Sequence, residues 1–417
     1  MPIDEKMIYV YMDNTTNPPA LVGRLYVSGN RGKELFAFEY SNDWISTGQS
    51  RHILDPDLAL YEGRQYVPSD KPLFGMFSDS CPDRWGRVLM KRREEYCARN
   101  EARKPRKLTE SDYLLGVYDE TRMGALRFSL EESGPFLSSD NTLAAPPWVK
   151  LRTLESASLA FENDENGAEE KWLYQLLAPG LSLGGARPKA SVQAPDGSLW
   201  IAKFPSKHDE WNTGTWEMVV HDLAVKCGLD VPEAKAEKFS DAGSTFIVKR
   251  FDRVENCRIH FASAMTLLGE TDGNADAGYL DMAAFIKSNG ASPKKDLREL
   301  WKRVVFNMAV SNTDDHLRNH GFLLSDSGWS LSPLYDVNPN IYGDSLSLNV
   351  SLSDSLISFD LATETAEYYD IDKTEAKTII DEIRSVVNDN WSIFAVNYGL
   401  SRSAINRMAP AFDAAYH

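Results

Sequence analysis

The sequence has few cysteines, and their spacing matches neither a disulfide framework nor a metal site. Its 417 residues include four cysteines, and no two of them form a CxxC pair. Those four are Cys81, Cys97, Cys227 and Cys257. We therefore expect reduced, structural thiols, as in a cytoplasmic protein, and neither a disulfide framework nor a zinc site.

Long apolar runs are also missing. No stretch reaches the roughly 18 consecutive apolar residues that a membrane-spanning helix needs. The first residues, MPIDEKMIYVYMDN, contain acidic side chains and no long apolar core. The sequence thus predicts neither a secretory signal nor a membrane span, and we expect the protein in the cytoplasm.

Basic residues are in the minority, with 45 Lys and Arg against 61 Asp and Glu and a formal net charge of -16. This balance argues against a broad basic surface that grips nucleic acid directly. A local cluster of cations lies between residues 91 and 107, but a solvated helix face explains it equally well and we assign it no function. The composition is 42% hydrophobic and 25% charged, which is typical of a folded globular protein.

The length exceeds the roughly 250 to 300 residues at which single hydrophobic cores stop growing, so more than one domain is expected. Residues 1–145 contain short alternating apolar segments between about 7 and 40, followed by helical patterns near 83–103 and 111–118. Clusters of proline and glycine near 134 and 145 mark the end of this region. We predict a β-rich N-terminal domain over 1–145.

The remaining chain divides near residue 252. The pattern over residues 146–252 predicts a helix, a hairpin with Pro-Asp-Gly at its turn, a second helix and another pair of strands. Residues 253–417 are mainly helical, with two short strands. The ranges expected for 146–252 are 168–177, 182–204, 215–226, 234–239 and 244–251, and those for 253–417 are helices 279–288, 294–311, 373–387 and 391–398 with strands 322–324 and 329–331. The fold class is therefore α+β.

The strongest chemical signal is NTDDHLRN, which directly follows the expected helix 294–311. Asp314 is followed five residues later by Asn319, and Asp336 comes after two short strands. Phosphoryl transfer needs this set: Asp314 can orient a hydroxyl group and accept its proton, while Asn319 and Asp336 can hold Mg²⁺ on the phosphates. Protein kinases have the same order of catalytic loop and metal-binding Asp.

Two other interpretations of this segment remain open. Asn and Asp are favoured at helix ends and in turns, so Asn312, Asp315 and Asn319 could simply end the preceding helix. Asp314, Asp315, His316 and Asp336 could instead form a hydrolytic metal cluster, although no further His or carboxylate motif completes it.

A cation for the α- and β-phosphates is expected at Lys203, in the apolar strand WIAKF. Glu217, in the following helix, is the expected ion-pair partner that would hold this ammonium in place. The alternative is an edge-strand lysine whose stem covers the sheet while its charge stays in water.

Upstream of this strand is the segment SLGGARPK. Its two glycines would allow the backbone to approach phosphate oxygens closely, and its two cations add positive charge, although a plain loop would also fit. The segment has neither the Walker spacing nor GxGxxG. Glycine loop, strand lysine, helix glutamate, catalytic loop and metal segment follow one another in the order of a kinase, and Ile247 to Phe251 would form the hinge that contacts adenine.

With these motifs the sequence resembles the HipA family of bacterial toxin kinases over nearly its whole length. The matching segments are SLGGARPKA for the phosphate loop, WIAKFP for the lysine strand, VKRFDR for the hinge, NTDDHLRN for the catalytic loop and LSPLYDV for the metal segment. DSCPDRWGR and the first strands look like the family's additional N-terminal domain. The resemblance implies a protein-kinase-like fold with an ATP-binding lobe at 146–252 and a catalytic lobe at 253–417.

The resemblance also implies roles for single residues. Asp314 would be catalytic, Asn319 and Asp336 would bind magnesium, and Ser182 would be the inhibitory autophosphorylation site. Arg187 departs from the family, since many members have Gln there. The residues implied in ATP binding are Gly184, Gly185, Ala186, Arg187, Pro188, Lys189, Lys203, Glu217, Lys249, Phe251, His316 and Tyr335.

The expected activity is transfer of the γ-phosphoryl group of Mg-ATP to a protein Ser or Thr. Members of the family often arrest growth and are neutralised by a small DNA-binding antitoxin of the HipB type, so DNA contact is expected only through such a partner. The best-known type phosphorylates a glutamyl-tRNA synthetase, which makes an aminoacyl-tRNA synthetase a candidate substrate. The alternatives are a kinase for a small molecule or lipid, and a catalytically weak corepressor that binds the antitoxin.

Overall fold

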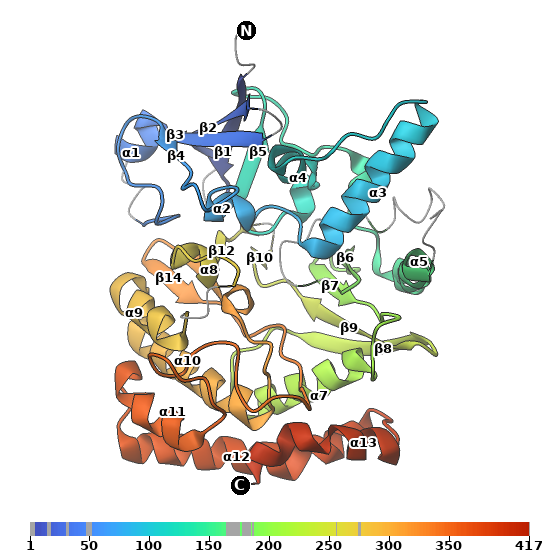
Figure 1. The fold of residues 1–417 in the computed structure, drawn as a ribbon, viewed down its shortest axis with the longest axis vertical. Coiled ribbons are helices and arrows are strands. Elements are labelled where there is room, and N and C mark those ends of the chain that lie inside the picture. The colour runs from blue at the N-terminus through green and yellow to red at the C-terminus, as the bar shows by residue number, and fades with distance from the viewer. Residues whose placement is uncertain are drawn as a thin grey trace. The chain divides into compact units, whose positions relative to one another are not determined.

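The chain forms two compact units (Figure 1). In this computed structural model the described residues are 5–14, 18–30, 33–46, 52–163, 176, 185, 187–255, 257–273 and 277–416. The first unit comprises Met1–Lys207 and Arg250–Ala262, and the second comprises His208–Lys249 and Ser263–His417. The expected division at residues 145 and 252 stays a prediction.

The first unit begins with the expected sheet. Its strands pair in the order β4-β3-β2-β1-β5, and every pair is antiparallel. Alternate side chains of β1, among them Ile8, Val10 and Met12, are at most 1% exposed and form its inner face. The strands are β1 (Glu5–Met12), β2 (Ala20–Asn30), β3 (Lys33–Tyr40), β4 (Gln65–Tyr66) and β5 (Leu126–Ser129).

Helices of the first unit start where the sequence offers caps. The side chain of Asp83 accepts a hydrogen bond from Gly86 N (2.8 Å) and begins α3, while Thr109 and Asp112 form a capping box for α4. Both helices were expected and are confirmed; the helix expected at 168–177 lies outside the described residues except for Leu176. The helices are α1 (Asn42–Ser46), α2 (Gly75–Ser78), α3 (Arg84–Asn100), α4 (Glu110–Gly116) and α5 (Leu151–Asn163), with 3-10 turns at Asp119–Thr121, Asn141–Leu143 and Trp148–Lys150.

The expected hairpin with Pro-Asp-Gly is also present. It consists of β6 (Lys189–Gln193) and β7 (Leu199–Lys203), which run antiparallel with Lys189 opposite Lys203. Gly197 in the turn has φ +86°, a left-handed conformation that suits glycine. Three short strands follow in the chain: β10 (Arg253–Val254), β11 (Cys257–Arg258) and β12 (Phe261–Ser263).

The second unit is mainly helical and is organised around α10. The α10 side chains Leu300, Trp301 and Val304 are fully buried, and α9, α11 and α12 pack around α10 (Figure 1). No helix among the described residues is long and apolar enough to cross a membrane. The elements are α7 (Thr213–Lys226), β8 (Ala234–Ser240), β9 (Gly243–Lys249), α8 (Ala264–Leu267), α9 (Tyr279–Asn289), α10 (Pro293–Ala309), β13 (Gly321–Ser325), β14 (Gly328–Leu331), α11 (Phe359–Thr365), α12 (Lys373–Asn397) and α13 (Arg402–Met408), with 3-10 turns at Leu317–Asn319, Ala366–Tyr369 and Ala409–Ala415.

One expectation for this unit was wrong. The sequence suggested two helices, 373–387 and 391–398, but α12 continues without a break from Lys373 to Asn397. The residues between the two expected helices, Asn388-Asp389-Asn390, are polar, but they include neither glycine nor proline. Asn390 Nδ2 donates to Val386 O (2.7 Å), four residues earlier, and the run follows the helix.

A buried ion cluster fixes the segment that follows β9. The carboxylate of Asp252 is fully buried and accepts hydrogen bonds from Arg250 Nη2 (2.6 Å), Arg253 Nη1 (2.5 Å) and Gly124 N (2.8 Å). Arg250 Nη1 also donates to Thr121 O (2.6 Å). Burial opposes the charge of Asp252, but the two guanidinium groups outweigh it and hold the pKa of Asp252 far below its usual range.

Replacement of Asp252 should therefore destabilise the first unit. We expect Asp252→Asn to lower the free energy of unfolding by about 3 to 5 kcal/mol at pH 7, because the buried guanidinium groups lose their counter-charge. Since the folded-state pKa is lowered, the stabilisation is complete above the unfolded pKa of about 4 and is lost as the pH falls below it. Denaturant unfolding of both proteins at several pH values should show the difference shrink in acid.

The matched control is Glu132→Gln. Glu132 is 62% exposed and lies 3.7 Å from Arg24 in the same unit. Exposed pairs of this kind contribute about 0 to 1 kcal/mol. An Asp252→Asn protein as stable as the Glu132→Gln protein would contradict the role given to the buried cluster.

Candidate active site

The segment NTDDHLRN lies where α10 ends. After Ala309 the chain turns at Ser311, which has a left-handed φ of +48°, and the loop then runs to the 3-10 turn Leu317–Asn319. Asp314 is exposed, whereas its neighbour Asp315 is buried. The two adjacent carboxylates thus have different surroundings, and only Asp314 faces the solvent.

Asp315 anchors the loop to the helices beneath it. Its Oδ2 accepts hydrogen bonds from Tyr279 OH (2.5 Å) and Asn307 Nδ2 (2.9 Å), and it lies 2.8 Å from His320 Nε2. Asn307 Oδ1 in turn accepts from Asn312 Nδ2 (3.1 Å). The sequence analysis did not find Tyr279, Asn307 or His320; an Asn within the apolar run VVFNMAV was the one signal that could have pointed to this network.

The loop is also tied to the segment that contains Asp336. Asn338 N donates to Asn312 Oδ1 (3.2 Å), and Asn340 Nδ2 donates to Thr313 Oγ1 (2.6 Å). Tyr335 OH donates to the carbonyl of Arg318 (2.7 Å). These bonds join the two segments on both sides of Asp336, so the structure brings together the stretches from which the catalytic and metal-binding residues are expected.

The electrostatics of Asp314 suit a group that accepts a proton. Its pKa is raised, first by partial removal from water and then by the negative charges of Asp336 and Asp315, while His316 lowers it. Asp336 has φ +59°, in the left-handed region that costs a non-glycine residue about 1 kcal/mol or more. Such strain persists only where surrounding contacts impose it, as the bonds on either side of Asp336 do.

Asn319 is the residue best suited to a cation. It is 4% exposed, and its Nδ2 donates to the carbonyl of Asp314 (3.2 Å). Its Oδ1 is buried and has no hydrogen-bond partner within the described chain. A buried amide oxygen without a donor is costly unless something else binds it, and a hard cation such as Mg²⁺ prefers oxygen ligands.

The second ligand would be the carboxylate of Asp336, which lies near enough to Asp314 to raise its pKa. The described residues contain no group of three or more His, Cys, Asp or Glu that could hold a metal. Mg²⁺ does not need one, because it is commonly bound by one or two carboxylates together with substrate phosphates and water. The residues present therefore fit magnesium.

The other residues expected in the second unit are placed as follows. His316 and Tyr335 are half-buried beside the catalytic loop, and Glu217 is 3% exposed in the middle of α7. Lys249 is the last residue of β9, and its Nζ lies 3.9 Å from Glu233 in an exposed pair.

In the first unit, Lys203 is the last residue of β7 and Lys189 the first of β6. Lys189 Nζ lies 2.6 Å from Asp83 Oδ2, a partner that the sequence analysis did not identify. The ring of Phe251 lies 6.1 Å from that of Phe261.

The glycine loop is only partly described. Gly185 is exposed with φ +30°, Arg187 is half-buried and Pro188 is buried. Ser182, Gly184 and Ala186 lie outside the described residues. Lys203 and Glu217 belong to different units, so their pairing stays a prediction.

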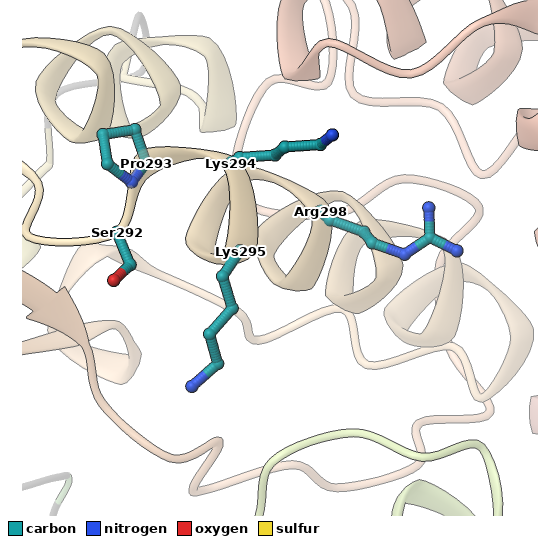
Figure 2. A pocket seen from close by; sticks show the side chains of 5 residues that line it. All are labelled: Ser292, Pro293, Lys294, Lys295 and Arg298. Carbon is teal, nitrogen blue, oxygen red and sulfur yellow. The ribbon is translucent and has the colours of Figure 1, made fainter.

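A separate surface hollow lies at the start of α10 (Figure 2). It is lined by Ser292, Pro293, Lys294, Lys295 and Arg298, none of which was expected in the site. Figure 2 shows the side chains of Lys294 and Lys295 pointing in different directions, so they do not converge on one point. Arg298 forms an ion pair with Glu375 of α12.

The network around Asp315 generates a prediction for stability. Tyr279→Phe removes one of the three groups that contact Asp315 Oδ2, and we expect the free energy of unfolding to fall by about 1.5 to 3 kcal/mol, because the lost bond involves a charged group. Chemical denaturation followed by circular dichroism would measure the change. Tyr342→Phe is the control, because Tyr342 is exposed and its hydroxyl donates to exposed Glu210 (3.2 Å). Equal effects of the two substitutions would contradict the proposed contribution of the Asp315 hydrogen bonds to stability.

Comparisons with known proteins agree with this arrangement. "Putative kinase Y4mE" of Sinorhizobium fredii is 31% identical over 183 residues, which are 38% of this chain and 42% of that protein. "Putative kinase Y4dM" of the same organism is 26% identical over 245 residues, 55% of this chain and 54% of that protein. The chain thus spans about half the length of these curated relatives.

The fold is that of HipA. HipA in the complex of Shewanella oneidensis MR-1 HipA, HipB and operator DNA superposes with a TM-score of 0.68 at 15% sequence identity, over 98% of this chain and 96% of that one. The expected α+β fold of the HipA type is confirmed. The model of the HipA-like C-terminal domain matches residues 181–391, which include both the lysine strand and the catalytic loop. On this match the chain belongs to the HipA-like family.

Proposed function

We propose that this protein is a Ser/Thr protein kinase that transfers the γ-phosphoryl group of Mg-ATP to a protein hydroxyl group. The observation that carries the proposal is the pair of joined segments in the second unit, where exposed Asp314, buried Asn319 and Asp336 come from one hydrogen-bonded arrangement. The names of the two Sinorhizobium fredii relatives support kinase activity in general.

Asp314 has the role of orienting the acceptor hydroxyl and taking its proton. It is exposed, so a protein substrate can reach it, and its loop is fixed from below by Asp315. Asn319 Oδ1 and the Asp336 carboxylate would hold magnesium, which when bound neutralises charge on the phosphates. In phosphoryl transfer most of the catalysis comes from positioning and charge stabilisation, which a fixed loop of this kind supplies.

Most residues proposed to bind the nucleotide belong to the first unit. Lys203 at the end of β7 is proposed to contact the α- and β-phosphates, with Glu217 as its partner, and the loop from Gly184 to Lys189 to cover them. Lys249 and Phe251 would flank the adenine, and His316 and Tyr335 would complete the ATP site. Autophosphorylation of Ser182 would add nearly two negative charges beside the phosphates and so inhibit nucleotide binding.

A small DNA-binding antitoxin is the partner that we propose. The HipA structure with the same fold was solved with HipB and operator DNA. This chain has a net charge of -16, so contact with DNA would be made through the partner rather than by a basic surface of its own. The substrate would be a protein, and an aminoacyl-tRNA synthetase is the candidate.

The test of the reaction is phosphate transfer from labelled Mg-ATP by the full chain, with mass spectrometry of Ser182 and of lysate proteins. Asp314→Ala should lower the rate at least about 10²-fold, because loss of a general base typically costs that much. Asp326→Asn is the matched control, since Asp326 is an exposed carboxylate in the β13–β14 turn and should keep full activity.

The outcomes separate the candidate functions. Label on a protein Ser or Thr in wild type alone supports the protein kinase. Label on a small molecule or lipid would favour that substrate class instead. ATP binding without transfer in wild type would favour the corepressor.

The pH dependence of the reaction provides a second prediction. Asp314 accepts a proton only when ionised, so kcat/KM should fall as the pH drops through its pKa. Because burial is the largest influence on Asp314 and raises this pKa, the fall should have its midpoint above the ordinary Asp value of about 3.9. Initial rates between pH 4.5 and 8 at one subsaturating concentration of Mg-ATP would measure it. A rate that stays constant as far as the chain remains folded in acid would contradict a general-base role.

A further inference from the structure

A buried ion pair at the start of β6 joins Lys189, the last residue of the proposed phosphate loop, to Asp83, which has no role in the function proposed so far. The Nζ of Lys189 lies 2.6 Å from Oδ2 of Asp83, and the two side chains are only 3% and 6% exposed. Lys189 Nζ also lies 3.3 Å from the carbonyl of Gly185, in the glycine loop. Removal of one member of an ion pair at this depth is strongly destabilising, because the other member remains buried without that counter-charge.

Asp83 is itself held firmly. Its second carboxylate oxygen, Oδ1, accepts from Gly86 N (2.8 Å) as the N-cap of α3. The neighbouring Trp85 donates from its indole Nε1 to the carbonyl of Lys189 (3.1 Å). The side chain and the backbone of Lys189 are therefore both fixed by the first turn of α3, more than a hundred residues earlier in the chain.

The position of Lys189 on the hairpin connects this ion pair to Lys203. Lys189 lies directly opposite Lys203 in the antiparallel pair of β6 and β7. Phe204 N donates to Pro188 O (2.9 Å), so the neighbouring pair is hydrogen-bonded and the two lysines form a pair without mutual backbone bonds. Side chains of such pairs share one face of the sheet and come closest to each other, and like charges there repel.

We propose that Asp83 is a positioning residue for Lys203. It neutralises Lys189 and fixes β6, so that the ammonium of Lys203 is not displaced by a second, uncompensated cation and can contact the nucleotide phosphates. The role of Asp83 is exerted through Lys189 rather than through contact with the nucleotide. The inference rests on the proposed function only in that Lys203 binds the phosphates of ATP.

The experiment measures calorimetric binding of Mg-ADP and of adenosine to the full chain. Asp83→Asn keeps a side chain that caps α3 as well as Asp does, but it removes the charge. We expect this variant to bind Mg-ADP about tenfold more weakly, a loss of about 1.4 kcal/mol, and to bind adenosine as wild type does, because adenosine has no phosphate. A general loss of fold would weaken both ligands together.

Two further variants make the test specific. Asp83→Glu keeps a negative charge beside Lys189, and we expect Mg-ADP affinity within about threefold of wild type, since the buried ammonium keeps its counter-charge. Glu110→Gln is the matched control, because it breaks the Arg87–Glu110 pair (2.7 Å) between α3 and α4 without touching β6. It should leave the affinity for both ligands unchanged.

Each outcome bears on the inference. Unchanged Mg-ADP binding in Asp83→Asn, or an equal loss for adenosine, would overturn it while the kinase proposal stands. If Asp83→Asn does not fold, Asp83→Glu decides, and a tenfold loss of Mg-ADP affinity there would overturn the inference. The expected binding pattern in a chain that transfers no phosphate would support the positioning role and remove the kinase proposal. Wild type that binds no Mg-ADP would overturn both.

Discussion

The buried carboxylate of Asp315 is the interaction on which the catalytic loop depends. One oxygen of this group forms hydrogen bonds with Tyr279 from α9, Asn307 from α10 and His320 from the end of the loop. A buried charge must be satisfied by donors of fixed geometry, so these three elements cannot move independently of one another. The exposed Asp314, one residue earlier, takes its position from this constraint.

Buried carboxylates also fix segments of the first unit, but there their partners are positively charged side chains. Asp252 is enclosed by Arg250 and Arg253, and Asp83 is paired with Lys189. In each case a segment with an expected role in nucleotide binding is held by a buried charge pair rather than by apolar packing alone. Charge pairs demand specific partners at specific distances, and this suits them to fixing a position more than to adding stability.

The sequence was informative wherever a pattern repeats locally. Helices α7, α9 and α10 and the hairpin β13–β14 follow from apolar spacing and turn residues, and the NTDDHLRN and LSPLYDV segments follow from their residue types and order. The partners of buried charges could not be found in this way, because Asp83 lies 106 residues from Lys189 and Tyr279 lies 36 from Asp315. The break expected in α12 failed for the opposite reason, since local preference for turns was outweighed by packing of the whole helix.

The division of the chain into units has a consequence for the order in which the protein can fold. Residues 208–249 of the second unit are inserted between two parts of the first, and Asp252, with its guanidinium partners, comes after the insertion. During synthesis, the contacts of Gly124 and Thr121 with this cluster must wait until about 130 further residues have been made. The N-terminal sheet therefore emerges from the ribosome long before its own unit can close, and by then the chain has already begun to build the other one.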